Sequence, residues 1–129
     1  MKIIINFFTM LVLFLASTGI VRSQWQEQTS GITTSLNSVS GVNDNIAWVC
    51  GNAGRVIRTN NGGITWINAT GTGIPGTLDL YNIFAIDSTT ALVTGSNTTA
   101  YVYRSTNGGL TWVQVFTQSG GFLNAIWMT

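Results

Sequence analysis

The 129-residue sequence contains no histidine, one cysteine and one proline, and only 7% of its residues are charged. The absence of histidine excludes His-based catalytic triads and His-containing metal sites, and a single cysteine cannot form a thiolate zinc cluster. Cys50 has no cysteine partner for an internal disulfide, and it lies in an apolar run, so we expect a buried structural thiol. We expect neither a metal nor a cofactor.

The few charges also limit the classes of partner. Beyond residue 23, three arginines stand against four acidic residues, a net charge of −1, and they form no basic patch for nucleic acid. Asp44, Asp79 and Asp87 all lie in predicted turns, and turn formation explains them better than the paired carboxylates of a glycosidase. We therefore expect no nucleic-acid partner and no catalytic residue within this sequence, although catalytic residues beyond residue 129 stay an open alternative.

Residues 1–23 have the pattern of a secretory signal peptide. Lys2 supplies the positive start, residues 3–15 form a short apolar core, and small and polar residues precede a cleavage point before Gln24. The apolar run is short for a membrane span, which leaves an uncleaved anchor as the alternative. We predict an exported protein (secreted, periplasmic or at the cell surface) with no membrane span in the mature chain.

A nine-residue pattern occurs twice, and it is typical of a hairpin turn between two strands. It runs from Arg58 to Trp66 and returns from Arg104 to Trp112, with Asn-Gly-Gly at the centre of both copies. The asparagine oxygen can accept hydrogen bonds from turn amides, and the glycines can supply positive φ angles. Each closing tryptophan is predicted to be a wedge between units, because a buried indole removes about 150–250 Å² from water. The predicted structural residues are Thr59, Asn61, Gly63, Thr65 and Trp66 in the first copy and Ser105, Asn107, Gly109, Thr111 and Trp112 in the second.

Self-similarity extends beyond these turns and divides the sequence into units of four short strands. Leu36-Asn37-Ser38-Val39 matches Leu80-Tyr81-Asn82-Ile83 and Leu123-Asn124-Ala125-Ile126. In the first unit we expect strands near residues 36–42, 46–51, 54–59 and 64–69. Four strands in about 40–50 residues is the size of a β-propeller blade. The prediction is an all-β fold, a β-propeller of four-stranded antiparallel blades, with blade 1 at 36–69 and blade 2 at 80–115.

Both ends of this region carry parts of further units. Trp25 stands where a fourth-strand tryptophan belongs, so residues 24–29 are predicted to be a lone outer strand that closes the ring on the last blade. Residues 123–129 are predicted to be the first strand of a third blade. A closed propeller needs at least about four blades, so we expect an N-terminal fragment of a longer protein. A two-blade protein that assembles with copies of itself is the alternative.

The nine-residue pattern resembles the Asp-box of bacterial-neuraminidase-type repeats, Ser/Thr-x-Asp-x-Gly-x-Thr-Trp, with Asn61 and Asn107 in place of the aspartate. Together with the lone Trp strand and the Leu-x-x-Val/Ile and Ala-x-Val-x-Gly strands, it resembles the photosystem II assembly and stability factor repeats. Wider relatives of this group are sortilin-type propellers, sialidases and xyloglucan-cleaving hydrolases. The resemblance covers nearly all of residues 24–129, and it implies that the boxes lie at the blade periphery and serve the fold.

This resemblance leads to two hypotheses on function. The first is a non-enzymatic exported propeller that acts as a binding, scaffold or assembly module for a protein or glycan partner. The alternative is a fragment of a secreted propeller glycoside hydrolase, sialidase-like or xyloglucanase-like. Arg58 and Arg104 occupy matching places beside the boxes and are expected on outer strands rather than in an active site. Tyr81, Phe84 and Trp127 lie on or beside first strands, where aromatics could contact a ligand, although core packing is the favoured interpretation.

Overall fold

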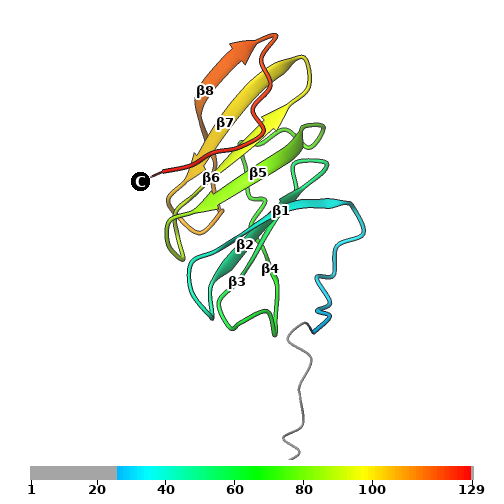
Figure 1. Cartoon of the computed structure of the whole chain (residues 1–129), viewed down its shortest axis with the longest axis vertical. Coiled ribbons are helices and arrows are strands. Elements are labelled where there is room, and N and C mark those ends of the chain that lie inside the picture. The colour runs from blue at the N-terminus through cyan, green and yellow to red at the C-terminus, as the bar shows by residue number, and fades with distance from the viewer. Residues whose placement is uncertain (1–25, 129) are drawn as a thin grey trace, which may run out of the picture.

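The computed structural model describes residues 26–128, and the strands in that range form two separate sheets. The predicted signal peptide at 1–23, together with Trp25 and Thr129, lies outside the described residues. Blade 1 contains β1 (Leu36–Gly41), β2 (Ala47–Gly51), β3 (Val56–Thr59) and β4 (Ile67–Asn68), and blade 2 contains β5 (Asp79–Ala85), β6 (Ala91–Ser96), β7 (Thr99–Ser105) and β8 (Val113–Ser119) (Figure 1).

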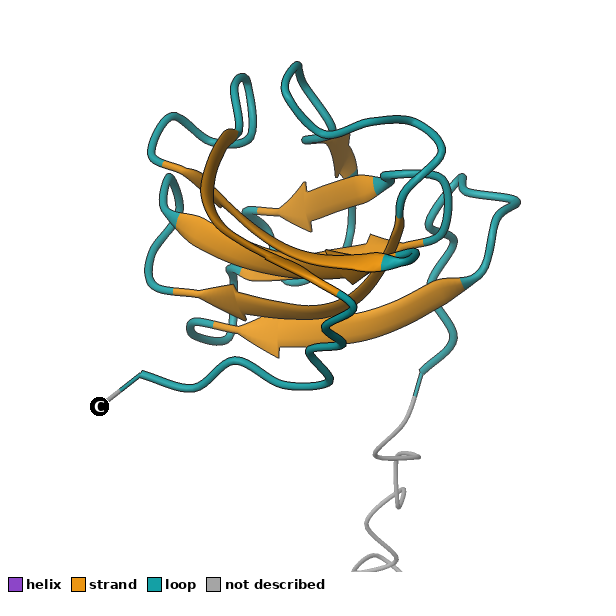
Figure 2. Ribbon diagram, turned by 90° about the horizontal axis from the view of Figure 1, so that it is seen from above, coloured by secondary structure: helices purple, strands orange, loops and turns teal. Residues whose placement is uncertain are grey.

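Each sheet is an antiparallel meander in which strands pair in chain order. Short turns join the strands, and no helix occurs within residues 26–128 (Figure 2). None of those residues therefore forms a helix long and apolar enough to cross a membrane. The predicted all-β fold of four-stranded antiparallel propeller blades is confirmed.

The repeat in sequence is also a repeat in strand register. Val49 of β2 lies opposite Val39 and Ile57, and the matching Val93 of β6 lies opposite Ile83 and Tyr103. The register of the first pair of strands shifts between Leu36 and Ser38 in blade 1 and at the matching place in blade 2. Because cross-strand partners share one face of a sheet, the two blades present equivalent side chains on equivalent faces.

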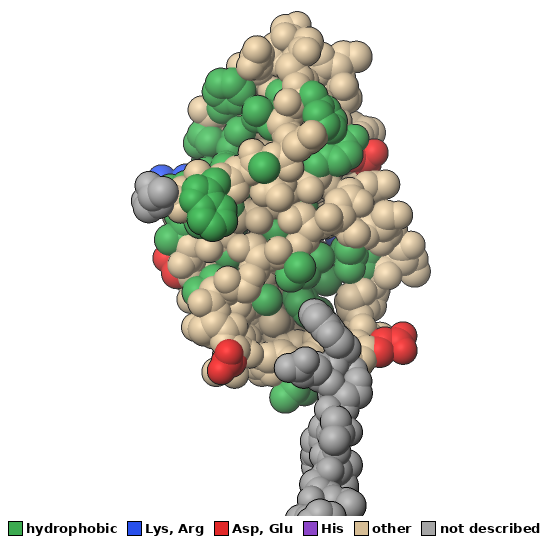
Figure 3. All heavy atoms as spheres, viewed as in Figure 1, with side chains coloured by type: hydrophobic (Ala, Val, Ile, Leu, Met, Phe, Trp, Pro, Cys, Tyr) green, Lys and Arg blue, Asp and Glu red, His purple; other side chains and the backbone are tan. Residues whose placement is uncertain are grey.

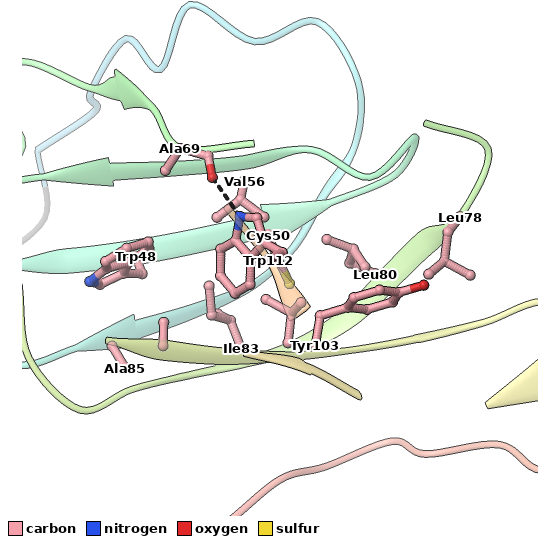
Figure 4. Packing of buried hydrophobic residues seen from close by; sticks show 12 residues of the cluster. Trp48, Cys50, Val56, Ala69, Leu78, Leu80, Ile83, Ala85, Tyr103 and Trp112 are labelled. Atoms are coloured by element: carbon pink, nitrogen blue, oxygen red, sulfur yellow. Dashed lines mark hydrogen bonds between the residues drawn. The ribbon is translucent and has the colours of Figure 1, made fainter. Parts of the chain in front are cut away.

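The hydrophobic core lies between the two blades. Blade 1 contributes Trp48, Cys50 and Val56, and blade 2 contributes a larger set that includes Ile83 and Trp112 (Figure 4). Trp48 and Trp112 are 0% and 3% exposed, and their rings meet edge to face at a centroid distance of 6.2 Å. Burial of apolar side chains on both sides of one contact makes the two sheets a single packed unit.

Polar contacts between the inner strands β1 and β5 complete the interface between the blades. Backbone amides of β5 donate to serine hydroxyls of β1, from Ile83 N to Ser38 Oγ at 3.3 Å and from Ala85 N to Ser40 Oγ at 3.0 Å. Asn37 Nδ2 also donates to the carbonyl of Leu80 at 2.7 Å. Short hydroxyl and amide side chains on β1 therefore satisfy backbone groups of β5 along the line where the blades meet.

The fourth strand of blade 1 is shorter than the sequence predicts. Strand β4 covers only Ile67–Asn68. It begins after a turn in which the amide of Thr65 donates to Asn61 Oδ1, and it ends where Asn68 Oδ1 accepts from the amide of Thr70 at 3.1 Å. Further on, Gly71 and Gly73 adopt positive φ angles of 52° and 107° as the chain crosses to blade 2. Strand β8 instead runs to Ser119, past the predicted end of blade 2 at residue 115.

The segment predicted as the first strand of a third blade is not a strand within residues 123–128. No described strand pairs with it as β2 pairs with β1. It nevertheless contacts blade 2 in a repeat-equivalent way, because Ile126 N donates to Asn82 Oδ1 at 3.2 Å, the counterpart of the bond from Ile83 to Ser38. Thr94 Oγ1 also donates to the carbonyl of Leu123 at 3.3 Å.

At the other end, residues 26–29 form no strand. They lie beside the first Asn-Gly-Gly turn, where Gln28 Nε2 donates to the carbonyl of Gly62 at 3.2 Å. The last blade, to which a ring-closing strand would be added, is not among the described residues. The role of residues 24–29 as a strand that closes the ring therefore stays a prediction.

Candidate functional site

The two Asn-Gly-Gly turns contain the same hydrogen-bond network. In the first turn, which we call box 1 (residues 59–66), Thr59 Oγ1 accepts from the amide of Gly63 at 2.9 Å and donates to Asn61 Oδ1 at 2.9 Å. Asn61 Oδ1 also accepts from the amide of Thr65 at 3.0 Å, and its Nδ2 donates to Thr65 Oγ1 at 2.9 Å. The asparagine therefore acts as acceptor and donor at once, which an aspartate carboxylate cannot do.

The second turn, box 2 (residues 105–112), repeats this network with serine in place of threonine. Ser105 Oγ accepts from the amide of Gly109 at 3.0 Å, and Asn107 Oδ1 accepts from the amide of Thr111 at 2.9 Å. Asn107 Nδ2 donates to Thr111 Oγ1 at 2.8 Å. In both boxes the glycine pair has positive φ, from 67° to 86°, so the turn requires glycine where its amides point inward.

The tryptophans that close the boxes differ in their environment. Trp112 is buried between the blades, and its indole Nε1 donates to the carbonyl of Ala69 at 2.9 Å (Figure 4). Trp66 is half-buried, and its Nε1 is shielded from water without a hydrogen-bond partner among the described residues. Trp112 is thus the wedge that the sequence predicts, whereas no blade packs against Trp66 within residues 26–128.

Arg58 joins the two blades, which the sequence did not indicate. The side chain leaves β3 and lies over the ring of Trp48, with its guanidinium carbon 5.5 Å from the ring centroid. Its Nε donates to the carbonyl of Gly108 at 3.2 Å, and Nη1 donates to the carbonyl of Ser88, also at 3.2 Å. Both carbonyls belong to blade 2, so the guanidinium connects the outer parts of the two blades through backbone acceptors.

Arg104 occupies the matching position on β7 but has a different environment. It lies opposite Leu92 in the ladder, as Arg58 lies opposite Trp48. Its side chain is exposed and makes no hydrogen bond to another described residue. The sequence shows only that Arg58 and Arg104 occupy equivalent positions in the repeat. It does not show that Arg58 bonds to carbonyls, because those carbonyls belong to turns that are distant in sequence and become close only in the fold.

The acidic side chains lie apart. Asp44 and Asp87 are in bends between strands, as predicted, whereas Asp79 is the first residue of β5 and not part of a turn. Asp87 Oδ1 accepts from Thr89 Oγ1 at 2.7 Å and from the amides of Thr89 and Thr90, and these hydrogen bonds lower the pKa of the carboxyl from 3.8 to about 2. Asp79 Oδ1 accepts from the amide of Ala53 at 3.0 Å. Within residues 26–128, no group of three or more His, Cys, Asp or Glu side chains could hold a metal ion.

Cys50 is fully buried in the core between the blades. Burial raises the pKa of its thiol from 9.0 to about 12, because the low-dielectric core disfavours the thiolate. A thiol with this pKa stays protonated at neutral pH and is a poor nucleophile. Cys50 therefore acts as a small apolar side chain.

The aromatic residues on the inner strand of blade 2 pair with the C-terminal segment. Tyr81 meets Phe122 at a ring-centroid distance of 5.1 Å, and Phe84 meets Trp127 at 6.3 Å. Trp127 is 81% exposed, and next to the second pair Phe84, Ala85, Ile86 and Met128 line a hollow of about 280 Å³. Figure 3 shows hydrophobic side chains gathered over the part of the molecule that blade 2 forms.

No protein-family model and no curated protein matches the sequence. Solved structures of YCF48, a photosystem II assembly factor, are similar. One, YCF48 bound to D1 peptide, has a TM-score of 0.61 and 18% identity over 75% of this chain and 31% of that chain. YCF48 from Cyanidioschyzon merolae has a TM-score of 0.54 and 24% identity over 73% of this chain and 30% of that chain.

These structures are β-propellers, and the likeness shows the fold of this chain. The similarity agrees with the sequence resemblance to photosystem II assembly-factor repeats. This chain spans about a third of the length of the structures that it matches.

Proposed function

We propose that the chain is part of an exported, non-enzymatic β-propeller that binds another protein and acts as a scaffold or assembly module. The observation that carries this proposal is the exposed aromatic surface made by Phe122 and Trp127, which pack against the half-buried Tyr81 and Phe84 at the inner edge of blade 2. Exposed aromatic side chains supply much of the binding energy at protein interfaces. A similar propeller, YCF48, has been solved with a D1 peptide bound, which supports a peptide or protein as the partner rather than a glycan.

The acidic residues give no support to the competing hydrolase hypothesis within the described part of the chain. Each of Asp79 and Asp87 accepts hydrogen bonds from backbone amides of its turn or of the neighbouring blade. The low pKa of Asp87 also makes it a poor general acid at neutral pH. We infer a binding role from the surface and leave hydrolysis as an outcome of the test.

Binding can be measured by fluorescence anisotropy of labelled peptides, with D1 peptide as the first probe and xyloglucan oligosaccharides as the glycan probe. Trp127→Ala should weaken peptide binding at least about tenfold if the aromatic surface is an interface hot spot. Ile64→Ala is the matched control, because Ile64 is 83% exposed but lies on box 1. Equal binding by both variants would contradict the proposed surface.

The enzymatic alternative is tested with fluorogenic sialosides and β-glucans on the same protein and on the longest available reading frame. We expect no turnover. Turnover that is lost on changing one carboxylate would overturn the non-enzymatic proposal. Export is tested separately by N-terminal sequencing of the protein recovered outside the cytoplasm, where a mature chain should begin at Gln24.

A further inference from the structure

Both boxes contain an Asn-Gly pair, Asn61-Gly62 in box 1 and Asn107-Gly108 in box 2, and no other asparagine of the sequence precedes a glycine. Asparagine is a chemically labile residue. The backbone nitrogen of the next residue can attack its side-chain carbonyl carbon, and glycine hinders this attack least because it has no side chain and a permissive backbone. The two boxes therefore contain the asparagines of the chain that are most reactive in this way.

The fold requires glycine at the second position of each pair. Gly62 and Gly108 have φ angles of 67° and 73°, which residues with a side chain rarely adopt. A Cβ atom on Gly62 would lie 3.2 Å from the carbonyl oxygen of Asp44, and one on Gly108 would lie 3.3 Å from the Arg58 guanidinium. Because the turn fixes the glycine, an asparagine at the preceding box position always forms the labile pair.

In the folded chain a hydrogen bond holds the attacking nitrogen of each pair. The amide of Gly62 donates to the carbonyl of Asn45 at 2.9 Å, and the amide of Gly108 donates to the carbonyl of Thr89 at 2.8 Å. The side-chain amide of each asparagine is held as well, because its Oδ1 and Nδ2 both bond within the box. Attack requires the nitrogen to leave its acceptor and approach the side-chain carbon, so the reaction needs the turn to open.

The acceptor carbonyls belong to the turns between the first two strands of each blade, and one side chain holds each turn. Asn43 Oδ1 accepts from the amide of Asn45 at 2.9 Å. In the same way, Asp87 Oδ1 accepts from the amide of Thr89 at 2.6 Å. Each of these side chains therefore positions the residue whose carbonyl holds the reactive glycine amide.

We propose that Asn61 and Asn107 are sites of spontaneous deamidation, and that the turn before the second strand of each blade protects them. In the reaction the Gly62 nitrogen bonds to the side-chain carbon of Asn61, and the bond from that carbon to Nδ2 breaks. The proton of the Gly62 amide passes through water to Nδ2, which leaves as ammonia. Water then opens the cyclic imide to aspartate or isoaspartate, and Asn107 reacts in the same way with Gly108. This inference does not depend on the proposed partner or on export.

The two products have different consequences for a box. In box 1, aspartate keeps an oxygen that accepts from the Thr65 amide and the Thr59 hydroxyl, and Thr65 Oγ1 can donate to the carboxylate. Aspartate is also the residue that the Asp-box motif has at this position. Isoaspartate instead lengthens the backbone by a methylene group inside a turn that is closed by short-range hydrogen bonds. The box therefore survives deamidation only when the product is aspartate.

The test is peptide mapping by mass spectrometry of the full chain during incubation at neutral pH, which locates the exchange of a side-chain NH2 group for OH. Both sites should react at least about tenfold more slowly in the folded chain than in guanidinium chloride, because opening is rare. Asn43→Ala should accelerate the reaction of Asn61 by about three- to tenfold and leave that of Asn107 unchanged. Asp87→Ala should accelerate the reaction of Asn107 by a similar factor and leave that of Asn61 unchanged. Each variant is thus the matched control for the other.

Conservative variants separate the lost acceptor from general damage to the turn. Asn43→Asp and Asp87→Asn keep an Oδ1 acceptor and should leave both rates unchanged. Circular dichroism verifies the sheets of each variant. If an alanine variant loses them, hydrogen exchange of the unchanged chain replaces it, and the amides of Gly62 and Gly108 should exchange slowly.

Three results would overturn the proposal. The first is deamidation of the folded and unfolded chains at equal rates. The second is an alanine variant with intact sheets that changes neither rate or accelerates both boxes equally. The third is fast hydrogen exchange of the Gly62 and Gly108 amides in the unchanged chain, because the protecting bonds would then open too often to limit the reaction.

Discussion

Box 1 and box 2 have the same hydrogen bonds but different surroundings. Thr59 and Ser105 hold equivalent amides, and Asn61 and Asn107 make equivalent bonds, all within one turn. The tryptophans that follow differ because Trp112 is buried between the two blades, while Trp66 lines a hollow with residues of blade 1 and Gln28. The turn is therefore a local structure, and the wedge is a property of the interface between blades.

The largest expected difference lies between the two tryptophans. Trp112→Ala should lower the free energy of unfolding by about 3–5 kcal/mol, because it leaves a cavity against Trp48 and removes the bond to the Ala69 carbonyl. Trp66→Ala should cost about 1–2 kcal/mol, because Trp66 is half-buried and has no indole hydrogen bond to lose. Urea unfolding of both variants measures the difference.

The tryptophan comparison has its own control in Trp127→Ala, a large exposed aromatic outside the interface between the blades. That change should leave the free energy of unfolding within about 0.5 kcal/mol of the unchanged chain. If Trp66→Ala and Trp112→Ala lowered the free energy of unfolding equally, the boxes, and not the interface between the blades, would determine what each tryptophan contributes to stability.

The two arginines give the next largest contrast. Arg58→Ala removes hydrogen bonds to the carbonyls of Gly108 and Ser88 and a cation–π contact with Trp48, and should cost about 1–3 kcal/mol. Arg104→Ala removes an exposed side chain and should change stability by less than about 0.5 kcal/mol. Thermal unfolding followed by circular dichroism compares the two. An equal loss of stability in Arg104→Ala would mean that Arg104 has a hydrogen-bond partner outside the described residues.

The asparagines should show the opposite pattern, equal effects in the two boxes. Asn61→Ala and Asn107→Ala each remove three bonds: one from a turn amide, one from the hydroxyl that starts the box (Thr59 or Ser105), and one to a threonine hydroxyl. The cost should be about 1–2 kcal/mol for each. The prediction follows from the local character of the network. Urea unfolding that gave a clearly larger loss for Asn107 would show that the box 2 turn depends on its contact with blade 1.

Much of the fold could be predicted from the sequence because the information is local and repeated. Alternating β-branched residues such as Val49 and Val93, together with glycine turns at a constant spacing, specify strands, hairpins and their order. Two copies of one pattern then specify two equivalent sheets. The hydrogen bonds of the boxes could also be expected, since their partners lie within four residues of each other.

The remaining features depend on contacts between distant residues. Nothing in identical motifs distinguishes Trp66 from Trp112, because the difference is whether a blade packs against them. The carbonyl acceptors of Arg58 carry no side-chain signature, so Gly108 and Ser88 could not be identified in advance. Residues 123–128 keep the first-strand pattern, yet a strand also requires a ladder partner, and none is present within residues 26–128.

The smallest expected effect concerns the turns that precede β2 and β6. Asn43 and Asp87 occupy matching positions, and each uses its Oδ1 to accept two turn amides. Only Asp87 titrates, and its hydrogen bonds with Thr89 and Thr90 lower the carboxyl pKa from 3.8 to about 2. Because the folded pKa is the lower one, its contribution to stability is present above the ordinary pKa and is lost as the pH falls toward 2.

Asp87→Asn should therefore reduce the acid sensitivity of the chain between about pH 4 and pH 2, since asparagine keeps the acceptor and removes the titration. The carbonyl of Asp87 also accepts from Trp48 Nε1 at 3.0 Å, so loosening of this turn at low pH reaches the interface between the blades. Urea midpoints measured across that pH range should fall less steeply for Asp87→Asn than for the unchanged chain. Asn43→Asp should add a matching acid-sensitive step in blade 1, and if neither substitution changes the slope, these turns do not contribute to the pH dependence.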